Sequence, residues 1–255
     1  MSDRERPGDS PQRPFLFPEV ARARLPSGLR LLLAPYGSTP LVTLALVTPG
    51  GAASDPRAVP GTAAFTADLL DAGTAAGSAL EIAEKVEQVG GFLSTSADWD
   101  GMTIAVSLLS RHIGMGLRLL AELATEATFP EEEIERLKQQ RATEFRARRA
   151  QPTALAGEAL IREIYGRRRF GTSLLGTESS IAAVSRSGIR RFADRHLTPR
   201  GAALIAVGDL DPEALKERAA RAFDGWTGAA PNRPKRSSPP SLAQVGVTIV
   251  DRPEA

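Results

Sequence analysis

The sequence of 255 residues predicts an α+β domain, because strand signals and helix signals both occur along it in a regular order. Three observations carry this prediction. Short runs rich in Leu and Val lie between Pro and Gly residues, as core strands do. An Asp-Gly turn separates two alternating segments and predicts a hairpin. Several longer segments have apolar residues at helical spacing and capping residues at their ends.

The first predicted elements are two strands. Leu29–Leu33 follows a Ser-Gly turn, and Leu41–Val47 lies between Pro40 and the stretch Pro49–Gly51. Both strands are expected in the core.

The stretch Pro60–Thr74 predicts a buried helix of about three turns. It begins with a Pro-Gly turn and ends at Gly73, and its apolar face contains Ala64, Phe65 and Leu69. Because most of its side chains are small, other elements can pack close to it.

The next segments carry clear local signals. Ser78–Val89 is predicted as a helix with a capping box formed by Ser78 and Glu81. Phe92–Ala97 and Met102–Leu108 are predicted as a hairpin around the Asp-Gly turn at residues 98–101.

The second half is predicted to be mainly helical. Glu131–Arg149 has acids in its first turn and arginines in its last, which complements the helix dipole. Its inner side is expected to hold Ile134, Leu137, Arg141 and Phe145, and its outer side to be either an interface or a solvated face. The remaining predicted elements are helices Ile113–Ala127, Pro152–Tyr165 and Ser179–His196, strand Ala202–Val207, and a helix from Asp211, its N-cap, to Phe223.

Composition changes divide the chain. Residues 1–20 are expected to be a disordered lead-in, residues 21–226 a folded domain, and residues 227–241 a Pro/Ser-rich linker. Residues 242–255 are predicted to contain a final strand, Val245–Val250, and their resemblance to a known family implies that they open a second domain absent from the sequence.

Several functions are disfavoured by composition. A net charge of +2 gives no case for nucleic-acid binding, and the lack of cysteine removes disulfides and thiolate chemistry. No signal peptide or membrane span is apparent, which predicts a cytoplasmic protein and leaves a periplasmic location open. The two histidines, His112 and His196, are interpreted as surface or helix-end residues.

The sequence motif of the first predicted helix resembles that of one protein family. Gly61-x-Ala63-x-Phe65, followed by Leu70 and Gly73-Thr74, is similar to the zinc-binding helix of the pitrilysin/insulinase peptidases, the inverzincins. Those enzymes contain the motif G-x-A-H-F-x-E-H-x-L-x-x-G-T. Its two His residues are zinc ligands, and its Glu polarises the zinc-bound water. On this chain, those three positions fall on Ala64, Ala67 and Asp68.

The same resemblance points to Glu144 as the equivalent of the third zinc ligand, 76 residues after Asp68. A second acid of the active enzymes is replaced by Leu137. Taken alone, Glu144 is interpreted as a solvated helix charge, and only the resemblance makes the ligand position an equal alternative. With Asp68 it also offers a two-carboxylate site for Mg²⁺ or Ca²⁺. Were the two acids buried and close, each would raise the pKa of the other. Phe170–Gly176 and the strand before Asp209 also resemble family segments.

The resemblance implies an antiparallel-rich mixed sheet with helices packed on one face. It also implies a catalytically inactive subunit that binds no zinc or other cofactor. Members similar to mitochondrial and bacterial processing peptidases work as pairs, so the expected partner is an active zinc peptidase subunit of this family. The heterodimer would enclose a chamber that binds a peptide substrate. The alternative is a scaffold or binding protein, similar to the peptidase-derived core subunits of a respiratory complex.

Overall fold

The computed structural model describes residues 16–166, 168–232, 246–249 and 251. Its centre is a six-stranded sheet in the order β1-β2-β8-β3-β7-β6. Only β2 and β8 pair in parallel, and every other pairing in this sheet is antiparallel. The strands are β1 (Ala21–Arg24), β2 (Arg30–Pro35), β3 (Leu41–Pro49), β6 (Phe92–Ala97), β7 (Gly101–Leu109) and β8 (Ala203–Gly208).

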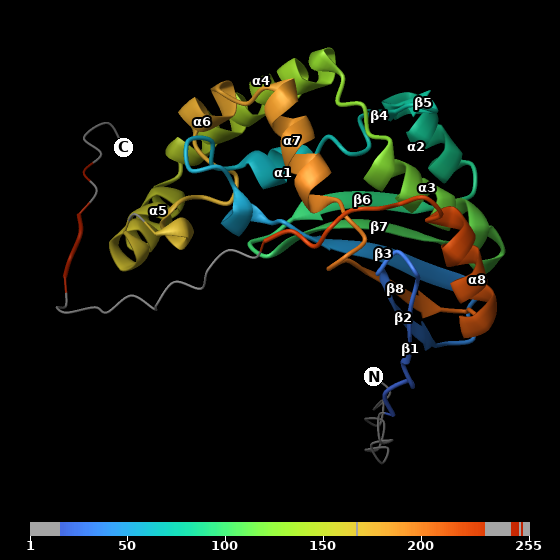
Figure 1. Cartoon of the computed structure of the whole chain (residues 1–255). Helices are drawn as coiled ribbons and strands as arrows, with labels where there is room; N and C mark the ends of the chain where they lie inside the picture. The colour runs from blue at the N-terminus through green and yellow to red at the C-terminus, as the bar shows by residue number, and fades with distance from the viewer. Residues whose placement is uncertain (1–15, 167, 233–245, 250, 252–255) are drawn as a thin grey trace, which may run out of the picture.

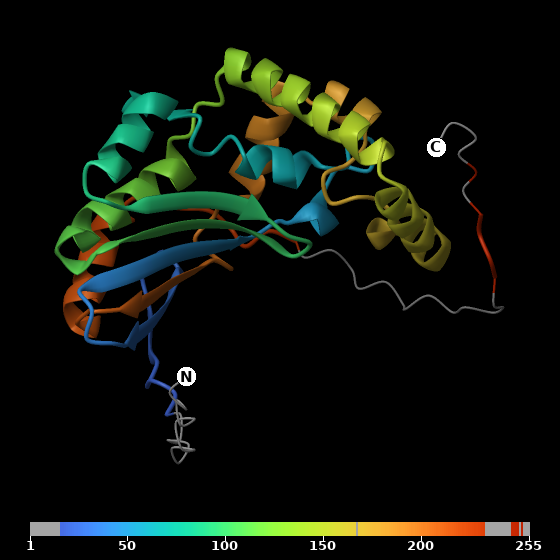
Figure 2. The same ribbon diagram turned by 180° about the vertical axis from the view of Figure 1, so that it is seen from behind.

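The helices pack on one face of this sheet (Figures 1 and 2). The predicted α+β fold, a mixed sheet rich in antiparallel pairs with helices on one face, is therefore confirmed. The helices are α1 (Thr62–Ala67), α2 (Ala79–Glu87), α3 (Ile113–Thr125), α4 (Glu131–Arg149), α5 (Pro152–Tyr165), α6 (Glu178–Ala182), α7 (Arg186–His196) and α8 (Pro212–Ala222), with short 3-10 turns η1 (Ala52–Ser54), η2 (Ser110–His112) and η3 (Arg169–Gly171).

Local signals in the sequence located several elements correctly. The Ser78–Glu81 capping box is present at the start of α2. Asp98 Oδ1 accepts hydrogen bonds from the amides of Asp100 and Gly101 at 2.7 Å each, which closes the β6–β7 hairpin. Asp211 caps α8 through the amide of Ala214 at 2.7 Å. These signals depend on neighbours in the chain, so sequence alone reveals them.

Two helix predictions were wrong in extent. Helix α1 ends at Ala67, because the amides of Leu69 and Leu70 bond to carbonyls three residues back instead of four. The predicted helix Ser179–His196 is two helices, α6 and α7. The break occurs because Ser185 caps α7, its Oγ accepting from the Gly188 amide at 3.2 Å.

Three other differences concern strands. Strand β1 and the small hairpin of β4 (Gly73–Thr74) and β5 (Gly77–Ser78) were not predicted. Strands β4 and β5 have two residues each and are too short to show an alternating pattern, and β1, Ala-Arg-Ala-Arg, contains no β-branched or aromatic residue. Residues 246–249 lie in no strand, against the predicted Val245–Val250. The rest of that segment, most of the predicted linker and residues 1–15 lie outside the described residues.

The sheet face away from the helices is covered by no described element (Figures 1 and 2). Toward one edge of this face lie Arg22, Arg24 and Arg30 of β1 and β2, whereas the outward side chains of β8, β3 and β7 include no charged residue. They are Leu41, Thr43, Ala45, Val47, Thr103, Ala105, Ser107, Leu109, Ala203, Ile205 and Val207. A solvated sheet face usually carries polar and charged residues. This uncovered sheet face therefore has the composition of a contact surface.

Both histidines lie at helix ends, as predicted. His112 precedes α3, and His196 ends α7. His196 is only 4% exposed, its ring stacks at 4.5 Å from Phe192, and its Nδ1 has no hydrogen-bond partner. A Cβ at Gly50 would lie 2.4 Å from His196 Cγ, so the glycine makes room for the ring. Burial lowers the pKa of His196 to about 4, with a further contribution from the charge of Arg195.

We expect His196 to make the fold acid-sensitive. Its pKa is depressed in the folded state, so the unfolded chain binds the proton more readily, and stability falls as pH drops from 6.5 to about 4. The contribution is about 2–3 kcal/mol between pH 7 and pH 4.5. Urea unfolding of the wild type and His196→Phe at both pH values measures it. The variant should lose less stability on acidification by that amount, and equal losses would contradict the prediction.

Candidate functional site

Helix α1 is fixed at its start by an acid from the preceding loop. Asp55 accepts hydrogen bonds from the amides of Gly61, at 2.6 Å, and Ala63, at 2.8 Å. Burial raises the pKa of this carboxyl to about 6, against the opposing effect of the two hydrogen bonds. The carboxyl oxygens satisfy amides that the first turn of a helix leaves without partners.

A second segment is packed against the same end of α1. Gly61 has a φ of +92°, and a Cβ there would lie 2.5 Å from the carbonyl oxygen of Leu175. Ser180 Oγ donates to the carbonyl of Pro60 at 2.7 Å. Two segments that resemble the peptidase family, the α1 helix and the loop 170–176, therefore meet in space. Only glycine allows so close an approach at position 61.

Two of the positions predicted from the zinc motif carry methyl groups: Ala64, at the first His ligand, and Ala67, at the Glu that polarises the water. Ala64 is 5% exposed and Ala67 is fully buried. Neither side chain has an atom that could bind a metal or accept a proton. The next position, Asp68, lies just past the end of α1 and is partly exposed.

Arg141 of α4 bridges the two acids that the sequence singled out. Its Nη2 donates to Asp68 Oδ2, and its Nη1 donates to Glu144 Oε2 at 2.6 Å. Gln140 Nε2 donates to the other oxygen of Glu144 at 3.0 Å. The Arg141 side chain is only 14% exposed. A guanidinium thus lies between the acids at the equivalents of two zinc ligands.

The two acids respond differently to this arrangement. Burial raises the pKa of Asp68, Arg141 lowers it in part, and the nearby charge of Glu144 raises it again. Burial alone would raise the pKa of Glu144 as well, but its hydrogen bonds from Gln140 and Arg141 outweigh burial and lower it. The effect expected for two close acids is therefore present at Asp68, where the charge of Glu144 raises the pKa, whereas the pKa of Glu144 is lowered by its hydrogen bonds and by the charge of Arg141.

The residues present do not fit a zinc ion. A protein zinc site needs at least three side-chain ligands. Here one of the three predicted ligand positions is Ala64, and the carboxylates at the other two, Asp68 and Glu144, already bind the guanidinium of Arg141. Within the described parts of the chain, no group of three His, Cys, Asp or Glu residues is arranged to hold a metal ion. Because both carboxylates bind the guanidinium of Arg141, the positive charge between them also disfavours a Mg²⁺ or Ca²⁺ site. Leu137, at the second-acid position, is buried in the core.

Sequence analysis named Asp68 and Glu144 but missed the role of Arg141. It placed Arg141 on the inner side of its helix, which is correct. The available signal was the spacing of Arg141 and Glu144, three residues apart on one helix face. The contact between Arg141 and Asp68 spans 73 residues, so no pattern of neighbouring residues in the sequence predicts it.

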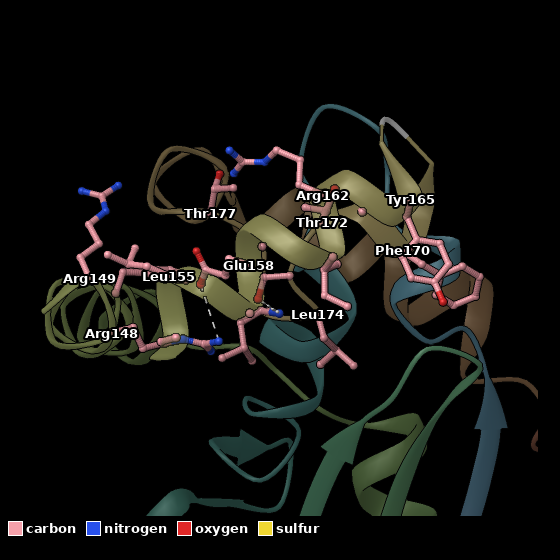
Figure 3. A pocket seen from close by; sticks show the side chains of 18 of the residues that line it. Arg148, Arg149, Leu155, Glu158, Arg162, Tyr165, Phe170, Thr172, Leu174 and Thr177 are labelled. Atoms are coloured by element: carbon pink, nitrogen blue, oxygen red, sulfur yellow. Dashed lines mark hydrogen bonds and ion pairs between the residues drawn. The ribbon is translucent and has the colours of Figure 1, made fainter. Parts of the chain in front are cut away.

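A large cleft begins beside this site. It has a volume of about 1290 Å³ and is lined by the end of α4, by α5 and by residues 170–178 (Figure 3). Phe145, the residue after Glu144, belongs to its wall. None of the helices described is both long enough and apolar enough to cross a membrane.

We expect Arg141→Met to destabilise the fold by about 1–3 kcal/mol at pH 7, because it leaves two acids facing each other without their cation. Arg136→Met, on the same helix, removes an exposed pair with Glu133 and should change stability by less than about 0.5 kcal/mol. Chemical unfolding at pH 7 and pH 4 measures both. Protonation of Asp68 relieves the repulsion, so the effect of Arg141→Met should shrink at pH 4. A loss that is equal at both pH values would contradict this account.

Similar proteins were found among curated sequences. An uncharacterized zinc protease of Bacillus subtilis is 22% identical over 198 residues, 78% of this chain and 48% of that protein. A probable β subunit of the mitochondrial-processing peptidase of Arabidopsis thaliana is 21% identical over 206 residues, 81% of this chain and 39% of the relative. The chain thus spans half or less of the length of these relatives.

Solved structures share the fold. A peptidase M16 inactive domain from Pseudomonas fluorescens matches with a TM-score of 0.81 and 24% identity, over 87% of this chain and 54% of that one. A protease from Helicobacter pylori matches with a TM-score of 0.78 and 19% identity, over 85% and 54% of the two chains.

Two protein-family models match this chain. The model described as insulinase, peptidase family M16, matches residues 31–178, and the model of the peptidase M16 inactive domain matches residues 183–255. The first match covers α1, α4 and the site between them. This chain therefore belongs to the insulinase family of peptidases, family M16.

Proposed function

We propose that this chain is a catalytically inactive M16 subunit that binds no zinc and pairs with an active, zinc-bearing member of the family. The pair would enclose a chamber in which the partner cleaves a bound peptide. One observation carries the proposal: the two acids at predicted zinc-ligand positions, Asp68 and Glu144, bind the guanidinium of Arg141, and the remaining ligand position is Ala64. Peptide hydrolysis by this family requires the metal-bound water that these residues cannot hold.

The Arg141 bridge explains how the fold persists without a metal. In a zinc site, the ion would link the helix at α1 to the helix at α4. Here the guanidinium makes the same link between Asp68 and Glu144 through charge-assisted hydrogen bonds. The domain can therefore keep its shape while its chemistry is supplied by another subunit.

The edge strand β6 supports a role in peptide binding. It pairs with β7 on one side and with no described strand on the other. Its sequence, Phe92–Ala97, contains no charged residue and no proline, the usual protections of a free edge. An extended peptide can pair with such an edge through its backbone.

The uncovered sheet face supports the pairing. Its central strands carry no outward charge, and Val207 and Leu41 are 38% and 51% exposed. Interfaces are depleted of charge at their centre in the same way. A second protein surface on this face would remove apolar side chains from water.

The names of the relatives are consistent with this proposal. Several are called zinc proteases, and one is named as a processing peptidase subunit.

The alternative is a scaffold with no peptidase partner. It is supported by similarity to a chain of complex III2 of Candida albicans, with a TM-score of 0.67 and 18% identity. Both proposals share the inactive site and differ in whether the partner cleaves peptides.

Metal content and cleavage test the main proposal. We expect the purified chain to contain no stoichiometric zinc and to cleave no peptide, because its ligand positions hold no donor set for the ion. Mixing with an M16 subunit that has an intact His-x-x-Glu-His helix should produce or raise cleavage. A mutant of that subunit lacking its Glu is the control and should restore nothing.

Either of two results would overturn the proposal. Stoichiometric zinc in the isolated chain would mean that other residues bind the ion. Binding to an intact subunit without any rise in cleavage would favour the scaffold alternative.

The uncovered sheet face provides a separate prediction. Val207→Lys places a charge at its centre and should weaken binding to the partner subunit at least about tenfold, since the charge must be desolvated. Leu80→Lys is a matched control, because Leu80 is a 68% exposed apolar residue on helix α2. Calorimetric titration with the partner measures both affinities, and melting temperatures verify folding. Equal affinity of the Val207 variant and the wild type would exclude this face as the interface.

A further inference from the structure

We propose that the cleft between α4, α5 and η3 binds peptide segments that carry both acidic side chains and apolar or aromatic ones. The inference rests on the proposed function, because it names the class of peptide that the subunit would bind. It is carried by the shape of the cleft, by its aromatic wall and by the distribution of arginines around it.

The cleft is large enough for a peptide segment. Its volume is about 1290 Å³, above the range usual for small-molecule sites, about 300–1,000 Å³. It is open along α5 and bounded on the other side by the loop that follows η3 (Figure 3). The same loop contacts Gly61 at the start of α1, so the cleft adjoins the inactive site.

One part of the cleft wall is aromatic. The ring of Phe170 lies 4.9 Å from that of Trp99 and 5.7 Å from that of Tyr165. Trp99 comes from the β6–β7 turn, whereas Tyr165 ends α5, so the cluster forms only in the folded chain. Phe170 remains 37% exposed. Such a cluster offers an apolar side chain a surface to pack on.

Helix α5 continues this apolar surface. None of its residues is buried, although its sequence contains several alanines and leucines. Ile161, which lines the cleft together with Leu155, is 40% exposed. A helix with exposed apolar residues beside a cleft is typical of a binding surface.

The charged residues of the cleft favour a negatively charged ligand. Three arginines line it, Arg148, Arg149 and Arg162, against two glutamates, Glu158 and Glu178. Exposed Arg168 and Arg169 lie next to Phe170 in the sequence. The whole chain carries a net charge of only +2, so this excess of arginine is local. A positive cleft attracts carboxylates more strongly than the net charge suggests.

The arginines are available to a ligand. Arg148 and Glu158 are 3.7 Å apart, beyond hydrogen-bond distance, and Arg149 and Glu178 are 3.1 Å apart with both side chains exposed. Exposed pairs of this kind contribute about 0–1 kcal/mol, so a carboxylate ligand can displace them. Arg162 forms no ion pair within the described residues. A guanidinium can bind a carboxylate through two parallel hydrogen bonds.

The glutamates argue for a peptide over a nucleic acid. A phosphate backbone carries a charge at every nucleotide, and Glu158 and Glu178 would repel part of it. Arg148 and Arg149 lie before the start of α5, and the aromatic cluster lies at its end (Figure 3). An extended peptide along α5 can therefore place carboxylates at the arginines and apolar side chains on the aromatic cluster.

Two labelled peptides test the proposal on the 255-residue chain. Both are about eight residues long, which spans about 27 Å when extended. In one, glutamates alternate with leucine and phenylalanine, and in the other lysines replace the glutamates. By fluorescence anisotropy, the acidic peptide should bind at least about tenfold tighter, and its binding should weaken as salt is raised.

Variants locate the binding to the cleft. Arg162→Glu should weaken binding of the acidic peptide about tenfold, by replacing attraction with repulsion. Arg218→Glu makes the same charge change on exposed α8, at the other end of the molecule (Figure 1), and should leave affinity unchanged. Trp99 emission should change on binding, and Trp99→Phe should abolish this change, since the other tryptophan, Trp226, is buried elsewhere.

Three results would overturn the inference: equal binding of the lysine peptide, no effect of Arg162→Glu, or an equal effect of Arg218→Glu. Tighter binding of a single-stranded oligonucleotide than of the acidic peptide would also overturn it. These outcomes leave zinc content and cleavage on mixing unaffected, so a failure here is distinguishable from a failure of the proposed subunit role.

Discussion

The contact of Arg141 with Asp68 and Glu144 is the interaction on which the centre of this structure depends. It joins α1 to α4 across 73 residues of sequence. A zinc ion brings charge from outside the chain, whereas a guanidinium is always present and always charged. In the proposed inactive subunit, this contact links the two helices without a metal ion, and it leaves no ligand set for the Lewis acid that peptide hydrolysis by this family uses.

The neighbourhood of that contact is organised around a short, buried helix. All six residues of α1 are buried, so it can hold only small or apolar side chains. Asp55 satisfies its first amides, and the loop through Leu175 is packed against Gly61. Because every side of α1 is covered, its position is determined by packing and not by its own helix propensity. The helix that resembles the catalytic helix of the family is thus a buried structural element in this chain.

The surfaces proposed for binding lie around the single sheet. The cleft of α4 and α5 lies on the helical side, beside the inactive site, and combines aromatic rings with arginines. The uncovered sheet face on the other side lacks charge at its centre. The first has the mixed character that suits a peptide, and the second has the flat apolar character that suits a protein partner. The proposed subunit role requires both kinds of surface, and one domain provides them.

The sequence by itself determined the features that depend on near neighbours. The capping box of Ser78, the turn at Asp98, the limits of α4 and the family spelling from Gly61 to Thr74 were all predictable, because each requires only a few adjacent residues. The tertiary structure decided that α1 stops at Ala67, that His196 is buried, and that Arg141 lies between two acids. It also decided which sheet face stays uncovered and where the cleft opens. These features arise from contacts between residues far apart in the chain, and a single sequence records no such distances.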